Sequence, residues 1–178
     1  MKRIVDLIKA DSIREKALDC VYQLSLPQCY IAAGFVRNLV WDDLHHKHAP
    51  TPLADIDVIY FDTKESEPEM YLVYEQLLTK MMPNVQWQVR NQACMHERNG
   101  DQPYTSTLDA MTYWPEKETA VAIRKINADE YECIAAFGFE SLFNLHITHN
   151  PKRDLDVFMS RVQSKNWLQH WPSLEVRS

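Results

Sequence analysis

The sequence predicts a mixed α/β fold of the α+β type, with a small mixed sheet flanked by helices. Two observations support this prediction. Helical spacing of apolar residues alternates with short β-branched runs over the first half of the chain. The second half adds two strand-like runs around a polar turn and then a helical C-terminal stretch. The length of 178 residues is close to one domain of roughly 150 residues, so we expect a single domain over residues 1–178.

In the first half of the chain, the pattern predicts two helices followed by a strand, a helix and a second strand. Residues 3–10 and 12–24 show the apolar spacing of amphipathic helices. Residues 29–33 are a short apolar run typical of a buried strand, which Gly34 ends before another helix. Residues 55–61 are β-branched, aromatic and partly alternating, which predicts the second strand.

The second half of the chain adds further helices and a hairpin. Helices are predicted over residues 70–81, 154–163 and 164–171, and strands over residues 85–93, 118–126 and 131–137. Pro83 is a stop signal for the first of these helices. The polar turn at residues 127–130 joins the last two strands, which is typical of a hairpin.

Charge, hydropathy and cysteine content argue against several classes of protein. The chain has 19 Lys and Arg against 25 Asp and Glu, a net charge of −6, which disfavours binding to bulk nucleic acid. No apolar run approaches the roughly 18 residues that a membrane span needs. The four cysteines show neither C-x-x-C nor zinc-site spacing, and no signal-peptide pattern is present. We therefore expect a cytoplasmic protein with reduced, mostly buried cysteines.

The sharpest chemical feature is the pair Asp55 and Asp57 at the start of a predicted strand. Residues two apart on a strand project from the same face, so the two carboxylates lie close together and repel. Mg²⁺ or Mn²⁺ is the cation that suits clustered carboxylates. We therefore predict a metal site at Asp55 and Asp57. The alternative is that these acids cap a neighbouring element.

A second Asp-x-Asp pair, Asp154 and Asp156, has a different context. The apolar residues after it recur at helical spacing, and residues two apart on a helix point about 200° apart. These two aspartates are better placed to interact with the dipole of the first helical turn.

The residues upstream of Asp55 predict a phosphate site. A strand ends at Gly34 and a helix follows, and a helix N-terminus offers free N–H groups to a phosphate. Arg37 is positioned to add a charge-assisted contact, its alternative being a salt bridge to Asp42, Asp43 or Asp57. Asn38 either orients Asp55 or caps the helix locally.

The run A-G-F-V-R-N at residues 33–38 and D-I-D-V at 55–58 resembles the G-G-x-V-R-D…D-x-D start of tRNA CCA-adding enzymes. These belong to the nucleotidyltransferase superfamily, which includes DNA polymerase beta. Nearly the whole chain is similar to a family of small bacterial nucleotidyltransferase-like proteins. The segments that fit are residues 87–96, 98–101, 109–111, 114–116 and 167–172.

The resemblance implies a nucleotidyltransferase fold and a matching activity. That activity is transfer of a nucleoside monophosphate from a nucleoside triphosphate to an acceptor, with Mg²⁺ or Mn²⁺ as cofactor. Asp55 and Asp57 are the implied catalytic and metal-binding residues. The predicted nucleotide-binding residues are Gly34, Phe35, Arg37, Asn38, Arg90, Asn91 and Arg124. For Arg90, Asn91 and Arg124, which lie on predicted strands beside the cleft, ion pairing is the alternative.

Two departures from the superfamily pattern favour an alternative function. Phe35 follows Gly34 where the superfamily has a small residue, and the strand over residues 85–93 lacks the usual third carboxylate. Asp109 and Glu116 are the candidates to replace that acid from a neighbouring segment. The alternative is a catalytically degenerate nucleotide sensor or protein-interaction module of the same fold. A weaker third reading is a metal-dependent phosphate-ester hydrolase.

The C-terminal stretch mixes basic and aromatic residues. The set comprises Arg161, Lys165, Trp167 and Trp171. Such a set could stack bases or clamp RNA. More often, tryptophans of this kind anchor a terminal helix to the sheet.

Overall fold

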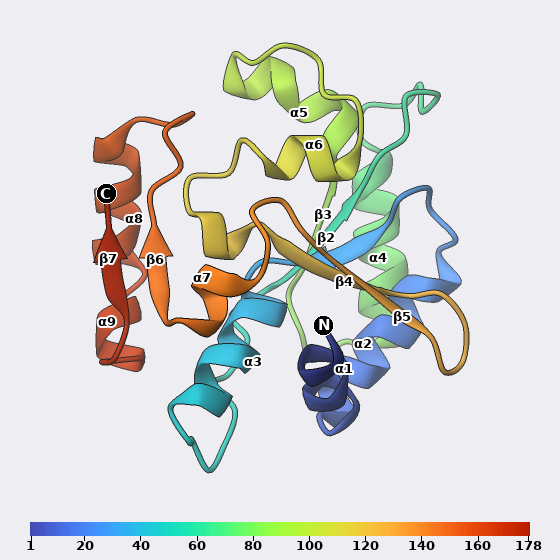
Figure 1. Ribbon diagram of the computed structural model, residues 1–178. Helices are drawn as coiled ribbons and strands as arrows, with labels where there is room; N and C mark the ends of the chain where they lie inside the picture. Colours follow the sequence, from blue (N-terminus) through green and yellow to red (C-terminus); the bar gives the residue numbers. More distant parts are fainter.

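The computed structural model describes residues 1–178, with a five-stranded mixed sheet at its centre (Figure 1). Its strands are β1 (Tyr30–Ala32), β2 (Ile56–Tyr60), β3 (Trp87–Asn91), β4 (Val121–Lys125) and β5 (Tyr131–Ala135). The longer helices are α1 (Lys2–Lys9), α2 (Ser12–Gln23), α3 (Gly34–Leu44), α4 (Met70–Met81), α5 (Gln92–Asn99) and α8 (Leu155–Ser164). The shorter elements are α6 (Thr107–Met111), η1 (Lys117–Thr119), α7 (Glu140–Phe143), β6 (His146–Thr148), α9 (Trp167–His170) and β7 (Glu175–Arg177).

The strand order of the sheet is β3-β2-β1-β4-β5, which places β1 in the middle. β2 and β3 are parallel, and the other neighbouring strands are antiparallel. Ala32 on β1 lies opposite Asp57 on β2. Because the two strands run in opposite directions, the end of β1 lies beside the start of β2. The sheet is therefore mixed and small, as the sequence predicts.

Both faces of the sheet are covered, because successive residues of a strand point to opposite sides. Ile31 and Val58 belong to the large core cluster, which α1 to α4 share. Tyr30, Ala32 and Ile59 belong to a second cluster, which includes Met111 of α6. Figure 1 shows α5 and α6 on one side of the sheet and α1 and α2 on the other.

Several element boundaries differ from the sequence prediction, and α5, α6, α7, β6 and β7 are not among the predicted elements. The predicted strand over residues 85–93 ends at Asn91, because the Asn91 side chain accepts a hydrogen bond from the Ala93 N–H and caps α5. The predicted strand over residues 118–126 begins only at Val121, after a 3₁₀ turn. The hairpin of β4 and β5 is confirmed.

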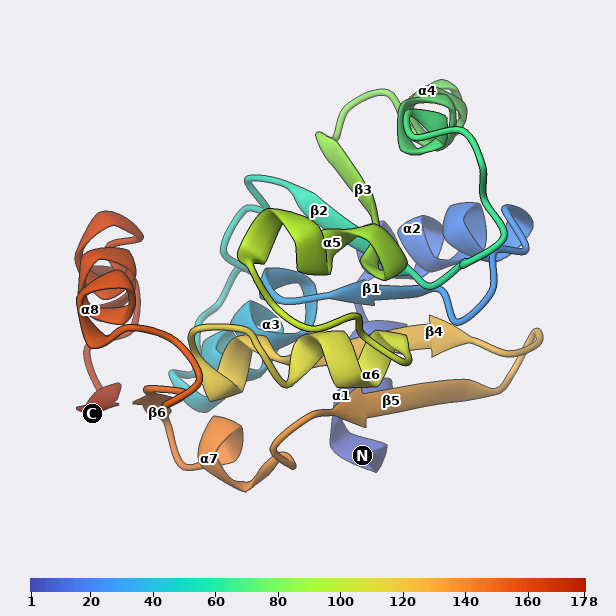
Figure 2. The ribbon, with the colours of Figure 1, turned by 90° about the horizontal axis from the view of Figure 1, so that it is seen from above.

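The C-terminal part forms a separate layer beside one end of the sheet (Figures 1 and 2). It contains α8, α9 and the parallel pair β6 and β7. Asp154 is the N-cap position of α8 and Asp156 lies in its first turn, as predicted for the second Asp-x-Asp pair. Three of the four cysteines are buried and Cys94 is exposed, and all are free thiols. None of the helices has the length and apolar character needed to cross a bilayer.

Candidate active site

A cleft of about 400 Å³ lies where β1 ends and β2 begins. The start of α3 and the start of β2 line one side, and residues 51–54 and the C-terminal layer line the rest. The lining residues that bear charge or donate hydrogen bonds are Arg37, Asn38, Thr51, Asp55, Asp57, Gln88, Thr119, Arg161, Lys165 and His170. Five of the residues predicted from sequence therefore meet here: Gly34, Arg37, Asn38, Asp55 and Asp57.

The turn from β1 into α3 is built on Ala33 and Gly34. Ala33 has a φ of 57°, in the region that favours glycine, so the turn concentrates its backbone strain there. Gly34 has a different role, because a Cβ at this position would lie 3.3 Å from the Asn38 amide nitrogen. Glycine thus leaves room for Asn38 to fold back over the start of the helix.

Asp55 and Asp57 bring two carboxylates to the same end of β2. The Gln88 amide donates a hydrogen bond of 2.9 Å to Asp55 Oδ2. Burial and the neighbouring charge of Asp55 raise the pKa of Asp57 to about 6, while Arg37 and Lys165 act in the opposite direction. The two half-buried acids share the cleft with Arg37 and Lys165.

Arg37 is the buried cation of the cleft, with 6% of its surface exposed. Its nitrogens donate to Thr119 Oγ1 at 2.5 Å and to Asn38 Oδ1 at 3.0 and 3.2 Å, and both partners are neutral. Its guanidinium lies over the rings of Trp41 and Trp167, at 5.0 and 4.5 Å from their centroids. Burial lowers the pKa of Arg37 to about 10. The alternative salt bridge to an aspartate does not form.

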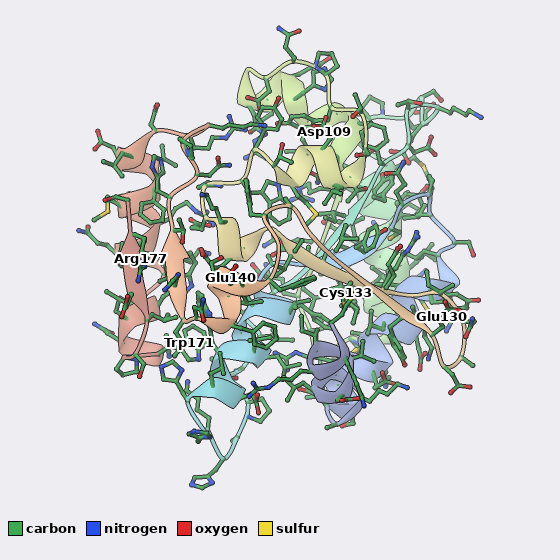
Figure 3. All side chains as sticks on the ribbon, viewed as in Figure 1. Asp109, Glu130, Cys133, Glu140, Trp171 and Arg177 are labelled. Atoms are coloured by element: carbon green, nitrogen blue, oxygen red, sulfur yellow. The ribbon has the colours of Figure 1, made fainter.

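The third carboxylate of the superfamily pattern has no equivalent here. Gln88 lies opposite Asp57 in the parallel register of β2 and β3, so a glutamine occupies the neighbouring strand position. Glu116 is buried and pairs with Arg161 at 2.5 Å. Asp109, labelled in Figure 3, lies on α6, where its carboxylate accepts hydrogen bonds from Thr105, and it does not line the cleft. No group of three His, Cys, Asp or Glu side chains is close enough to hold a metal ion.

Phe35 does not line the cleft. It is 1% exposed and belongs to the large core cluster, where the Arg14 guanidinium lies 5.5 Å from its ring centroid. Consecutive residues of a helix point about 100° apart, so the residue after Gly34 turns into the core. The predicted contact of Phe35 with a nucleotide is therefore corrected, and its bulk does not narrow the cleft.

Arg90, Asn91 and Arg124 also lie outside the cleft, which corrects their predicted nucleotide contacts. Arg90 forms a salt bridge of 2.9 Å with Glu75, and Arg124 forms one of 2.5 Å with Glu132. The Asn91 side chain caps α5 and donates to a loop carbonyl. The ion-pair alternative holds for both arginines, since each has an acidic neighbour that the linear sequence does not reveal.

The C-terminal layer forms one wall of the cleft. The sequence alone favours a packing role for its tryptophans. Trp167 and Trp171 are buried, so their rings have little free surface for a nucleobase. Arg161, Lys165 and His170, in contrast, line the cleft. The only sequence signal for this wall is the mixture of basic and aromatic residues. The tryptophans anchor the layer, and the basic residues face the carboxylates.

Comparisons with known proteins show the family and the fold of the chain. A family model described as nucleotidyltransferase matches residues 19–176. A solved structure described as revealing a CCA-adding enzyme head domain is 30% identical, with a TM-score of 0.86, covering 100% of this chain and 96% of that one. A tRNA-processing enzyme complex has 16% identity and a TM-score of 0.48, covering 86% of this chain and 40% of that one. A search of curated protein sequences finds no match.

Proposed function

The chain belongs to the nucleotidyltransferase family, and from that premise we propose that it transfers a nucleoside monophosphate from a nucleoside triphosphate to an acceptor hydroxyl. One observation supports the proposal above the others. A buried arginine without an anionic partner and two adjacent carboxylates line the same cleft. A nucleoside triphosphate with its divalent cation complements both, because its phosphates suit Arg37 and its metal suits Asp55 and Asp57.

Asp55 and Asp57 fit a magnesium or manganese ion. Magnesium is commonly held by one or two carboxylates while substrate phosphates and water complete its shell, so two acids suffice. Desolvation and the charge of Asp55 raise the pKa of Asp57, and a bound divalent cation would offset both effects. When bound, such a metal neutralises phosphate charge and helps to activate the attacking hydroxyl.

The residues of the chain have distinct roles in the proposed reaction. The free N–H groups at the start of α3 and the Arg37 guanidinium hold the phosphates of the donor. The acceptor oxygen forms a bond to the α-phosphorus and releases its proton. The bond from the α-phosphorus to the bridging oxygen breaks, and pyrophosphate leaves with that electron pair. Orientation and charge stabilisation account for most of the catalysis in this class of reaction.

A second candidate function is favoured by Gln88. A glutamine beside Asp55 and opposite Asp57 supplies no base and no third negative charge. A site of this kind suits a nucleotide sensor that binds the triphosphate without transferring it. The two candidates share the same ligand and differ only in turnover.

The test is a thermal melt with each nucleoside triphosphate, with and without Mg²⁺ or Mn²⁺. Ligand at 100 times its Kd adds about 2.7 kcal/mol, which raises Tm by roughly 5–11 °C for a chain of this size. We expect a metal-dependent rise in wild type that Asp57→Asn abolishes. Asp156→Asn is the matched control, because it changes the same residue type in the Asp-x-Asp pair of α8.

Pyrophosphate release separates transferase from sensor. A transferase releases pyrophosphate from the stabilising nucleotide in the presence of an acceptor, whereas a sensor binds that nucleotide without release. If no nucleotide raises the Tm of the wild-type protein, both candidates fail.

A further inference from the structure

We propose that Lys165 binds the terminal phosphates of the donor nucleotide, the part that leaves as pyrophosphate. This inference rests on the proposed function and adds a residue that the family pattern at residues 33–57 does not contain. Lys165 lines the same cleft as Asp55 and Asp57 and is the C-cap residue of α8.

The three cations that line the cleft, Arg37, Arg161 and Lys165, differ in the partners that they already have. Arg161 is bound to buried Glu116, with Nε 2.5 Å from Oε1. Each nitrogen of Arg37 already donates one hydrogen bond to Asn38 or Thr119, which leaves only part of its donors for a ligand. Lys165 is exposed, and its ammonium forms no salt bridge or hydrogen bond. It is the cation of the cleft with all three donors free for an incoming anion.

Lys165 lines the same cleft as the carboxylates of Asp55 and Asp57. A ligand that binds a divalent cation at Asp55 and Asp57 brings its remaining phosphates toward this ammonium. A compact, mobile ammonium suits a phosphate group that moves away once the bond has broken.

The C-terminal layer is bound to the rest of the molecule on both sides of Lys165 in the chain. Before it in the chain, Arg161 pairs with Glu116. After it, the Trp171 indole donates to Asp42 Oδ1 at 2.8 Å, and the Ser173 N–H donates to His45 at 3.1 Å. The backbone at Lys165 thus lies between two anchored segments, one on each side in the chain.

The structural alternative is that Lys165 only stabilises the end of its helix. A cation near a helix C-terminus interacts favourably with the dipole, and the Lys165 N–H caps α8 by donating to the Arg161 carbonyl. A capping role affects thermal stability but does not distinguish pyrophosphate from inorganic phosphate. The ratio of these two affinities is therefore the informative measurement.

Isothermal titration calorimetry with inorganic pyrophosphate and with inorganic phosphate, both in excess Mg²⁺, provides the test. We expect Lys165→Ala to raise the Kd for pyrophosphate about 10-fold, since one charge-assisted contact is lost. The Kd for inorganic phosphate should change less, and Lys165→Arg should restore most of the affinity. Lys16→Ala is the matched control, because it removes an exposed lysine on α2 and changes the net charge equally.

Three outcomes would overturn the proposal. They are no pyrophosphate binding by the wild type, equal Kd values for the wild type and Lys165→Ala, and an equal loss in Lys16→Ala. Failure of the proposed function looks different. In that case the wild type binds pyrophosphate through Lys165, yet no nucleoside triphosphate gives a metal-dependent rise in Tm that Asp57→Asn removes.

Discussion

Two buried arginines, Arg14 on α2 and Arg37 on α3, have opposite surroundings. Arg14, 2% exposed, forms a salt bridge with Asp11, donates to the Phe35 carbonyl at 2.9 Å and stacks on the Phe35 ring. Arg37 stacks on two tryptophans but bonds only to neutral side chains. A charge taken out of water is normally paired, so an unpaired one is costly to the fold. From this difference we infer that Arg14 stabilises the fold and that Arg37 binds a ligand.

Substitution of each arginine by methionine tests whether Arg14 and Arg37 have different roles. Arg14→Met removes one partner of a buried ion pair and leaves Asp11 with less compensation. We expect a loss of about 3 kcal/mol in the free energy of unfolding, measured by urea denaturation. An unchanged free energy of unfolding would contradict a stabilising role of the Arg14–Asp11 salt bridge.

Arg37→Met should behave in the opposite way. The methionine keeps much of the packing against Trp41 and Trp167 and removes a buried charge that has no salt-bridge partner. We expect the free energy of unfolding to stay the same or increase by about 1 kcal/mol, while triphosphate affinity falls by about 2 kcal/mol. Denaturation and calorimetry on the same preparation measure both. A large loss of stability would place Arg37 with the structural residues.

A third arginine, Arg153, also forms a salt bridge, and we expect its loss to have a smaller effect on stability. Arg153 forms two hydrogen bonds, of 2.9 and 2.5 Å, with the Asp101 carboxylate, and these bonds lower the pKa of Asp101. The folded state therefore binds the Asp101 proton less tightly than the unfolded state, so the stabilisation is full above about pH 4 and is lost as the pH falls below it. Asp101→Asn should cost about 1 kcal/mol at pH 7. The difference from wild type should shrink in melts at low pH.

Much of the site could be predicted because its signals are local. Asp55 and Asp57 are two apart on one strand, and Gly34, Arg37 and Asn38 lie within one helical turn. The mixed sheet and the hairpin follow from periodicity in the same way. Each of these depends on residues that are close together in the chain.

What could not be predicted depends on residues far apart in the chain. Gly34 lines the cleft, whereas Phe35, the next residue of the same helix, points into the core. The local sequence does not determine which side of this helix faces the core. Arg90 and Arg124 pair with Glu75 and Glu132, and these partners become visible only in the folded chain. The position of Lys165 in the cleft likewise requires knowing where α8 docks.

The network at Asp42 has a consequence for how the cleft forms during folding. This buried carboxylate accepts hydrogen bonds from Thr51, nine residues along, and from Trp171, 129 residues along. Contacts across so many residues have a high loop-closure cost and form late. The two acids and the glycine turn can therefore be in place while the opposite wall is still missing. We expect a competent cleft to be among the last parts of the molecule to mature, and a destabilised C-terminal layer to leave a folded sheet with an open, non-binding site.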